Sequence, residues 1–347
     1  MVKAGSLVEG YGETGMAHLL EHMLFKGAGT RASVKADLNK LGARWNATTT
    51  ADRTSYFEVL PADSDRVAEA LRIEADRFLR AGFTRADLSS EMTVVRNEME
   101  RNDSNPNSVV MRALQRQSFF WHGYGRPTIG ARSDVEGVDF DALQSFYRRH
   151  YRPDNAFLLV SGNFDSSRVL AQVLELFGQA RNPSTGKPVA ATHEEPHAVT
   201  NRSEVYLHAG VTLAASAWKI PAAYARENIA LRLASSAICS KDWGSLRREV
   251  VIERKAALSA TCYGMDWQQA GLLVATAYGN QDSDAEALSR ATREHIETAA
   301  SQGLSQDQLD RARAEELTAF ARVGNAHESF AQLLAEAEMA GDWRLAF

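Results

Sequence analysis

Residues 15–27 read Gly15-Met-Ala-His-Leu-Leu-Glu-His-Met-Leu-Phe-Lys-Gly27, and the rest of the chain is organised around this stretch. Apart from His18, Glu21 and His22, its middle is almost entirely apolar. A run that is apolar on every side and closed by glycine predicts a short buried helix. Three polar side chains inside such a helix need partners, because an unpaired buried polar group costs about 1–3 kcal/mol.

The spacing of these polar residues indicates a metal site. His18 and His22 are four residues apart, so they project from one face of a helix, with Glu21 beside them. A divalent metal satisfies both imidazoles at once, and a neighbouring carboxylate can handle the protons of a water molecule. The order H-x-x-E-H is the inverted form of the usual zinc-protease motif. The alternative is a chance grouping of two core histidines and a glutamate, which is costly inside an apolar helix.

Composition limits the classes of function. The chain has 347 residues, of which 44% are hydrophobic and 24% charged, with a formal net charge of −5. That length suffices for two domains of ordinary size. No segment approaches about 20 uninterrupted apolar residues, so we expect no membrane span. The mild acidity is unlike the basic surface of nucleic-acid-binding proteins. Cys239 and Cys262 are too few for a disulfide scaffold and lack metal-type spacing, so we interpret them as buried small hydrophobic residues.

Both ends of the sequence read as cut ends. No signal peptide opens the chain, and residues 2–9 resemble the end of a strand. Residues 341–347 stop where a connection begins. We therefore expect a fragment or trimmed chain, which leaves its compartment unknown, with the bacterial periplasm and the cytoplasm both compatible.

The first half of the chain predicts a helix, two strands and further helices. Residues 42–60 contain two β-rich runs with a turn at residues 51–53. The threonine-rich first run has little apolar alternation, as in an exposed edge strand. It is either an ordinary sheet margin or a strand to which an extended peptide can add. Helices are predicted over residues 33–41, 62–81, 88–102, 107–120, 141–150 and 166–177, and a buried strand over 156–163.

Two glutamates in the helix of residues 88–102 are candidates for a third metal ligand. Glu91 and Glu98 flank its apolar stripe on one side, two turns apart. Glutamates on a helix usually form a solvated face. Catalytic zinc, however, commonly takes two histidines and one carboxylate and leaves a position for water. His122 lies in the turn-rich residues 121–127, and we interpret it as a loop or capping histidine.

In the second half of the chain, predicted strands and helices alternate as they do in the first half. Periodicity disappears over residues 179–196, where Pro, Gly, Ser and Thr dominate. We therefore place a first domain at 1–180, a linker at 181–198 and a second, related domain at 199–347. His295 and His327 are interpreted as surface residues. Strands are predicted over 204–213, 257–263 and 272–278, and helices over 222–239, 245–253, 284–301 and from 305 onward.

With these residues in view, the chain resembles the pitrilysin family of zinc metallopeptidases, which includes insulin-degrading enzyme and mitochondrial processing peptidase. Residues 15–27 are similar to the zinc helix of the family, and residues 42–56 to its substrate-binding edge strand. Residues 91–98 are similar to the helix that brings a supporting glutamate and then the third ligand. Residues 122–127 and 151–162 also follow the family pattern, and the similarity is looser after residue 200.

The resemblance implies a fold and a set of site residues. The fold would be α+β, with two related domains that each have a mainly antiparallel sheet with helices packed on one face. His18, His22 and Glu98 would hold Zn²⁺. Glu21 would be the general base that activates water, and Glu91 would orient a ligand. The substrate-binding residues would be Asn46, Ala47 and Thr48.

The resemblance also implies a zinc-dependent endopeptidase that hydrolyses peptides or unfolded polypeptide segments. Family members need an Arg and a Tyr from a later domain or partner, but residues 245–263 depart from the family wording, so we assign no such pair. We expect a second half or companion subunit, in a homo- or heterodimer, to close the chamber. The alternative is a non-catalytic core or scaffold subunit, a class that usually loses the zinc residues retained here. A metal-dependent hydrolase of a non-peptide substrate fits the edge strand poorly.

Overall fold

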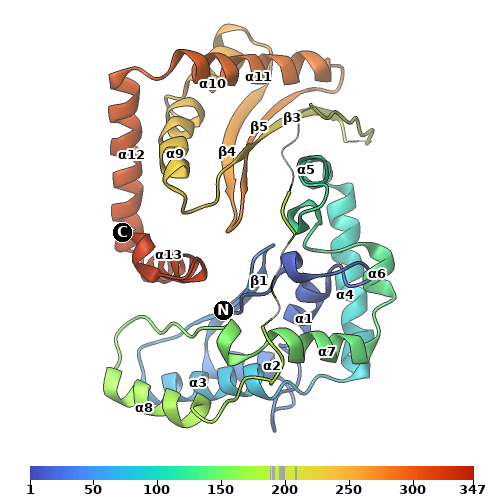
Figure 1. The fold of residues 1–347 in the computed structure, drawn as a ribbon, viewed down its shortest axis with the longest axis vertical. Helices are drawn as coiled ribbons and strands as arrows, with labels where there is room; N and C mark the ends of the chain where they lie inside the picture. Colours follow the sequence, from blue (N-terminus) through green and yellow to red (C-terminus); the bar gives the residue numbers. More distant parts are fainter. Residues whose placement is uncertain (188, 190–191, 195–199, 208) are drawn as a thin grey trace. The chain divides into compact units, whose positions relative to one another are not determined.

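The computed structural model describes residues 1–187, 189, 192–194, 200–207 and 209–347, so part of the predicted linker at 181–198 lies outside the described residues. The chain forms two compact units (Figure 1). The first comprises Met1–Glu100 and Trp121–Glu195, and the second comprises Arg101–Phe120 and Pro196–Phe347. A segment from the first half of the chain therefore belongs to the second unit. Among the described residues, no helix is both long and apolar enough to cross a membrane.

The first unit is built around α1 (Met16–Met23) and a two-stranded antiparallel sheet. Strand β1 (Arg44–Thr49) pairs with β2 (Thr54–Val59) in a register that runs from Arg44 opposite Val59 to Thr49 opposite Thr54. Short 3₁₀ turns are η1 (Ser6–Val8), η2 (Gly123–Gly125) and η3 (Pro153–Asn155). The other helices are α2 (Val34–Leu41), α3 (Ser64–Leu79), α4 (Arg85–Ser104), α6 (Arg132–Glu136), α7 (Phe140–His150) and α8 (Ser166–Phe177). The last residues of α4, from Arg101, belong to the second unit.

The prediction of a short buried helix is confirmed in α1. Its apolar residues are at most 4% exposed and belong to the core of the unit, together with residues of α4 and α7. The helix begins after Gly15, whose φ of 89° favours glycine. A Cβ there would lie 2.7 Å from both Ile129 O and Val135 Cγ2, so no larger residue fits without movement. The N-terminus of the helix is thus held close to the segment that precedes α6.

One predicted strand of the first unit is wrong. Residues 156–163 form no strand, and only an isolated bridge joins Ala156 to Val2. Phe157 exchanges backbone hydrogen bonds with Met1, which extends the pairing by one residue. Apolar character alone does not make a strand, because its backbone groups also need a neighbouring strand. Among the residues with described positions, that neighbour is confined to the first residues of the chain.

The second unit contains a three-stranded antiparallel sheet in the order β3-β5-β4. Its core lies between this sheet and helices α9 and α11. The prediction of α+β units with antiparallel sheets is confirmed. The elements are β3 (Val211–Ile220), β4 (Ser259–Asp266), β5 (Gly271–Asn280), α5 (Pro106–Ser118), α9 (Arg226–Cys239), α10 (Ser245–Arg247), the π-helical turn η4 (Arg248–Glu253), α11 (Ala285–Gln302), α12 (Gln306–Gly324), α13 (His327–Met339) and η5 (Trp343–Ala346).

The strand predicted over residues 204–213 is displaced. The observed strand begins at Val211 and runs to Ile220, opposite the full length of β5 from Asn280 to Gly271. The partner strand sets this position, because each residue of β3 is paired with one residue of β5. Local β propensity around residue 205 carries no information about that register.

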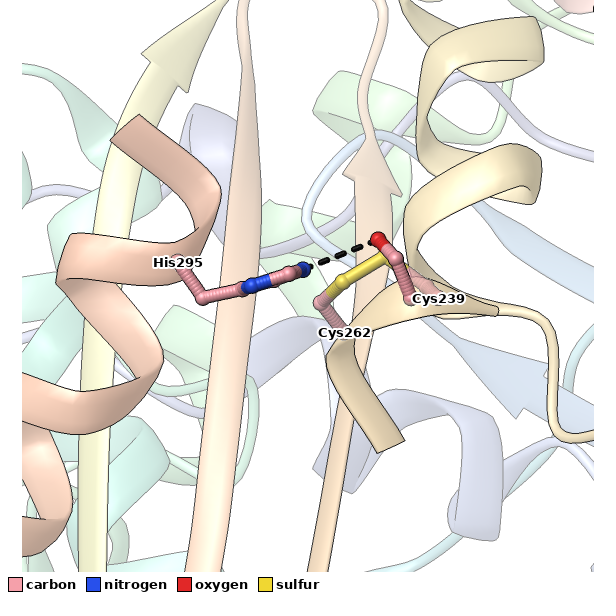
Figure 2. The surroundings of a disulfide bond; sticks show 4 residues. Cys239, Cys262 and His295 are labelled. Carbon is pink, nitrogen blue, oxygen red and sulfur yellow. Dashed lines mark hydrogen bonds between the residues drawn. A yellow bond between two sulfur atoms is a disulfide. The ribbon is translucent and has the colours of Figure 1, made fainter. Parts of the chain in front are cut away.

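The two cysteines and His295 also differ from prediction (Figure 2). Cys239, at the end of α9, forms a disulfide with Cys262 in β4, so the interpretation of the two cysteines as merely buried small hydrophobic residues is wrong. The two lie 23 residues apart, and only the packing of α9 on β4 brings them together. His295 is half-buried, and its Nε2 lies 2.8 Å from Ser245 Oγ, so its assignment to the surface is also wrong. His327 is exposed, as predicted.

Candidate metal centre

Three side chains from two helices converge in the first unit. Helix α1 presents His18 and His22 from one face, and α4 presents Glu98. His18 Nε2 lies 3.6 Å and His22 Nε2 lies 3.7 Å from Glu98 Oε2. The three candidate ligand atoms all lie within 4.8 Å of one another. The structure thus brings together His18, His22 and Glu98, the second of the two candidate glutamates in the sequence.

The chemistry of this donor set fits a metal ion better than mutual pairing. The separations from Glu98 exceed hydrogen-bond lengths. Burial, with a smaller effect of His22, lowers the pKa of His18 to about 4, so this imidazole is neutral at pH 7 and forms no ion pair. Ligands bound tetrahedrally to zinc at about 2.1 Å lie roughly 3.4 Å apart. The two distances from Glu98, 3.6 and 3.7 Å, are close to that value, so the residues present fit Zn²⁺.

Glu91 fixes the orientation of His22. Its Oε1 lies 3.0 Å from His22 Nδ1, and its Oε2 lies 2.5 Å from Lys26 Nζ. Burial raises the pKa of Glu91, but the hydrogen bonds from Lys26 and His22 outweigh burial and lower it overall. An ionised Glu91 can only accept, so Nδ1 of His22 carries the proton and Nε2 keeps its lone pair. That tautomer is the one a metal requires at Nε2.

Glu21 lies on the same helix but outside the converging triad. It is 9% exposed, and its Oε2 accepts a hydrogen bond of 2.5 Å from Thr49 Oγ1 at the end of β1. Burial raises the pKa of Glu21, and the hydrogen bond from Thr49 acts in the opposite direction. A carboxylate with a raised pKa is a better proton acceptor than an exposed one. The position and environment of Glu21 therefore suit proton transfer more than metal ligation.

The N-terminal end of α1 is anchored by Glu9. Glu9 is 3% exposed, and its two carboxylate oxygens accept from the backbone N–H groups of Gly15 at 2.9 Å and Ala17 at 2.8 Å. Arg126 donates to the carbonyl oxygen of Glu9. Free N–H groups at a helix start otherwise lack partners, and this carboxylate satisfies two of them. The anchor fixes the turn of the helix that carries His18.

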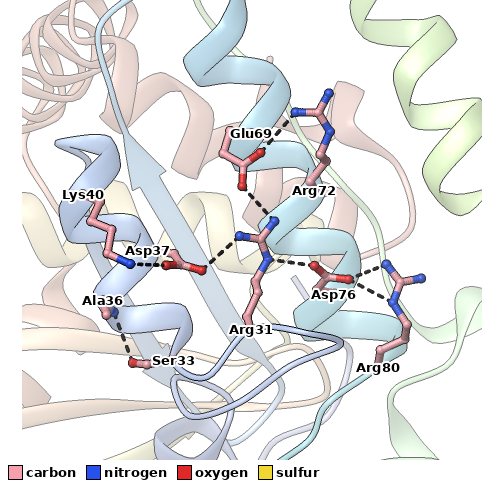
Figure 3. Close-up of polar contacts among 9 residues, drawn as sticks. All are labelled: Arg31, Ser33, Ala36, Asp37, Lys40, Glu69, Arg72, Asp76 and Arg80. Carbon is pink, nitrogen blue, oxygen red and sulfur yellow. Dashed lines mark hydrogen bonds and ion pairs between the residues drawn. The ribbon is translucent and has the colours of Figure 1, made fainter.

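The segment that follows α1 is anchored by Arg31 (Figure 3). Its guanidinium group contacts three carboxylates, with Asp37 of α2 at 3.0 Å, Glu69 of α3 at 2.8 Å and Asp76 of α3 at 2.7 Å. Backbone hydrogen bonds from Val34 to Lys26 O add to this connection. Both ends of the histidine-bearing helix are therefore tied to neighbouring elements, which keeps the site geometry fixed.

The predicted substrate-binding residues lie in β1. Asn46 and Thr48 are exposed, whereas Ala47 is 6% exposed. Thr48 Oγ1 accepts a hydrogen bond of 2.8 Å from Arg53 Nη1. In the part of the chain that the structure describes, β1 pairs with β2 alone, as an edge strand does. Helix α1 packs against this strand, so the edge and the metal-binding helix are neighbours.

His122 is a capping residue, as predicted. It precedes η2, and its Nδ1 accepts from the backbone N–H of Tyr124 at 3.2 Å. Sequence reasoning missed three other contributors to the site, namely Glu9, Lys26 and Thr49. Lys26 follows His22 by four residues, which is a usable signal for a shared partner. Glu9 and Thr49 are connected to α1 through loops, so their positions in the sequence do not predict that they contact this helix.

Sequence comparisons assign the family. The insulinase profile (peptidase family M16) matches residues 1–132, and the profile of the M16 peptidase inactive domain matches residues 137–316. The chain belongs to the M16 family of peptidases. The resemblance to pitrilysin-type zinc metallopeptidases is thereby confirmed.

Several relatives of this M16 chain are named as zinc proteases. Zinc protease PqqE of Helicobacter pylori is 25% identical over 316 residues, which cover 90% of this chain and 71% of that protein. An uncharacterized zinc protease of Rickettsia bellii is 30% identical over 179 residues, which cover 51% of this chain and 43% of that protein. An uncharacterized zinc protease of Mycobacterium tuberculosis is 33% identical over 192 residues, which cover 54% of this chain and 43% of that protein. The chain thus spans less than half the length of the latter two.

Solved structures share the fold. A protease from Helicobacter pylori superposes with a TM-score of 0.89 at 23% identity, covering 99% of this chain and 84% of that one. The first half of the periplasmic protease PqqL from Escherichia coli superposes with a TM-score of 0.72 at 20% identity. The superposition covers 99% of this chain and 79% of that one. Together they show that the fold of this chain is shared with these proteases.

Proposed function

We propose that this M16 chain is the catalytic part of a zinc-dependent endopeptidase that cleaves peptides or unfolded polypeptide segments. One observation carries the proposal, namely the convergence of His18 Nε2, His22 Nε2 and Glu98 Oε2 with Glu21 beside them on α1. Two neutral imidazoles and one carboxylate are the usual protein ligands of catalytic zinc.

Each residue of the site has a separate task in this mechanism. Bound Zn²⁺ would lower the pKa of a water molecule and polarise the peptide carbonyl. Glu21 accepts the proton of the attacking water and passes it to the leaving nitrogen, and its raised pKa suits both steps. Glu91 holds His22 in the tautomer that leaves Nε2 free for the metal.

The substrate is held as an extended strand along β1. Backbone pairing recognises an extended chain whatever its sequence, so a folded protein that offers no free strand is a poor substrate. Asn46, Ala47 and Thr48 supply that edge. A second half or companion subunit closes over the site, excludes water and contributes the residues that act on the substrate carbonyl.

The disulfide supports a compartment outside the bacterial cytoplasm. A structural disulfide such as that between Cys239 and Cys262 is typical of compartments where thiols are not kept reduced. Of the periplasm and the cytoplasm, the periplasm meets that condition. Thiol labelling of the protein as isolated from cells, with and without prior reduction, tests this placement.

The zinc assignment is tested by metal content and hydrolysis together. In the full-length protein with its companion half, Glu98→Gln should lose zinc, whereas Glu100→Gln, two residues further along α4 and exposed, should retain it. Glu21→Gln should retain zinc and lose turnover by roughly 10²–10⁴-fold. The substrates are a short unstructured peptide and a stable folded protein. Wild-type protein that binds zinc but cleaves neither substrate would favour the alternative, a non-catalytic scaffold subunit.

A further inference from the structure

The last residue of β1 contacts the candidate general base directly. Thr49 Oγ1 lies 2.5 Å from Glu21 Oε2, although the two residues are 28 positions apart in the chain. Thr49 also ends the strand that carries the predicted substrate edge. A single hydroxyl therefore links the strand of the substrate site to the carboxylate of the proton-transfer site.

The direction of this hydrogen bond follows from the hydrogens available. Thr54, opposite Thr49 in the β1–β2 register, has its Oγ1 3.3 Å from Thr49 Oγ1. The hydrogen of Thr54 is committed to Ala4 O at 2.9 Å. A hydroxyl has one hydrogen to donate, and a carboxylate at 2.5 Å is a stronger acceptor than a hydroxyl at 3.3 Å. Thr49 therefore donates to Glu21, and its direction is fixed by its neighbours.

We infer that Thr49 is a positioning residue that holds one carboxylate oxygen of Glu21 and leaves the other to accept the proton of the attacking water. This inference rests on the proposed function. A buried carboxylate without a fixed donor would sample other rotamers, and proton transfer depends on its placement. Because β1 supplies the donor, the strand that pairs with substrate also sets the position of the base. Thr49 acts on the chemical step and leaves substrate and zinc binding unchanged.

The test distinguishes the effect of the Thr49 hydroxyl group from the effect of the shape of its side chain. In the full-length protein with its companion half, Thr49→Val keeps the branched shape and removes the donor, whereas Thr49→Ser keeps the donor. We expect kcat on an unstructured peptide to fall roughly 10- to 100-fold in Thr49→Val. KM and zinc content should stay at the wild-type values, and Thr49→Ser should retain kcat within about threefold. A crystal structure of zinc-loaded Thr49→Val should show the Glu21 carboxylate displaced from its wild-type rotamer.

The matched control is Thr318→Val, the same change at an exposed position of α12. Thr318 Oγ1 donates to the backbone carbonyl oxygen of Ala314, so its loss leaves β1 and Glu21 unchanged. We expect wild-type kcat for this control. Wild-type kcat in Thr49→Val, equal losses in Thr49→Val and Thr49→Ser, a rise in KM alone, or loss of zinc would each overturn the inference. Wild-type protein that fails to bind zinc would instead overturn the proposed function on which it rests.

Discussion

Replacing Glu9 by Gln should change the pH dependence of stability in the first unit. Glu9 anchors the start of α1 through two backbone hydrogen bonds and is almost fully buried. Burial raises its pKa from 4.5 to about 8, while the hydrogen bonds from Ala17 and Gly15 act in the opposite direction. A carboxyl group with a raised pKa in the folded state favours folding when it is protonated. Its contribution is complete below pH 4.5 and is lost as the pH rises toward 8.

The size of this effect follows from the two pKa values. A tenfold difference in proton affinity corresponds to about 1.4 kcal/mol, so a rise from 4.5 to about 8 corresponds to about 5 kcal/mol of stability lost across that pH range. Glutamine has no such titration, and its NH2 group cannot accept from the second N–H, as the hydroxyl oxygen of a protonated carboxyl group can. At pH 5 we expect the Glu9→Gln variant to be less stable than wild type by about 1–3 kcal/mol. As the pH rises, the difference should move in favour of the variant by up to about 5 kcal/mol.

Urea unfolding of the chelator-treated protein between pH 5 and pH 8.5, followed by circular dichroism, measures this difference. Other titrating groups cancel in the comparison, because they are common to both proteins. Glu175→Gln, the same change at an exposed position of α8, should show no pH-dependent difference from wild type. A difference between Glu9→Gln and wild type that stays constant across the pH range would refute the reasoning.

Two further predictions concern the framework around the site. Arg31→Met leaves Asp37, Glu69 and Asp76 without their shared partner, so the free energy of unfolding should fall by about 2 kcal/mol at neutral pH; unfolding in urea checks this, and a smaller loss is expected at high salt. Removal of the disulfide by the double change Cys239→Ala and Cys262→Ala should lower stability by about 3 kcal/mol for a loop of this length. Thermal unfolding with and without reductant checks the second prediction, which an unchanged midpoint would contradict.

The features that the sequence predicts are those that depend on local spacing. The apolar run around His18 and His22 fixes both the helix and the shared face of the two imidazoles, because helical periodicity acts over four residues. The flank that carries Glu91 and Glu98 follows from the same periodicity within α4. Choosing Glu98 as the third ligand required the resemblance to a family, since spacing alone treats the two glutamates alike.

The features that were missed depend on contacts between distant segments. The disulfide, the displaced start of β3 at Val211 and the absence of a strand at residues 156–163 all reflect which neighbour a segment meets. Periodicity and propensity describe a segment by itself and contain no such information. Thr49 was predicted only as part of a polar edge, although its hydroxyl faces the base.

The buried polar atoms of α1 show how the fold prepares this site. The free N–H groups at its start are paired with Glu9, and His22 Nδ1 is paired with Glu91. Glu21 Oε2 is paired with Thr49 at the end of β1, so three elements outside the helix supply partners to these polar atoms. The atoms that converge with Glu98 are different, because among the described residues they face one another at distances too long for hydrogen bonds. Among the described residues, His18 Nδ1 is also buried without a hydrogen-bond partner. Unpaired buried polar atoms cost free energy, so we expect a metal ion that pairs the converging atoms to stabilise the folded state.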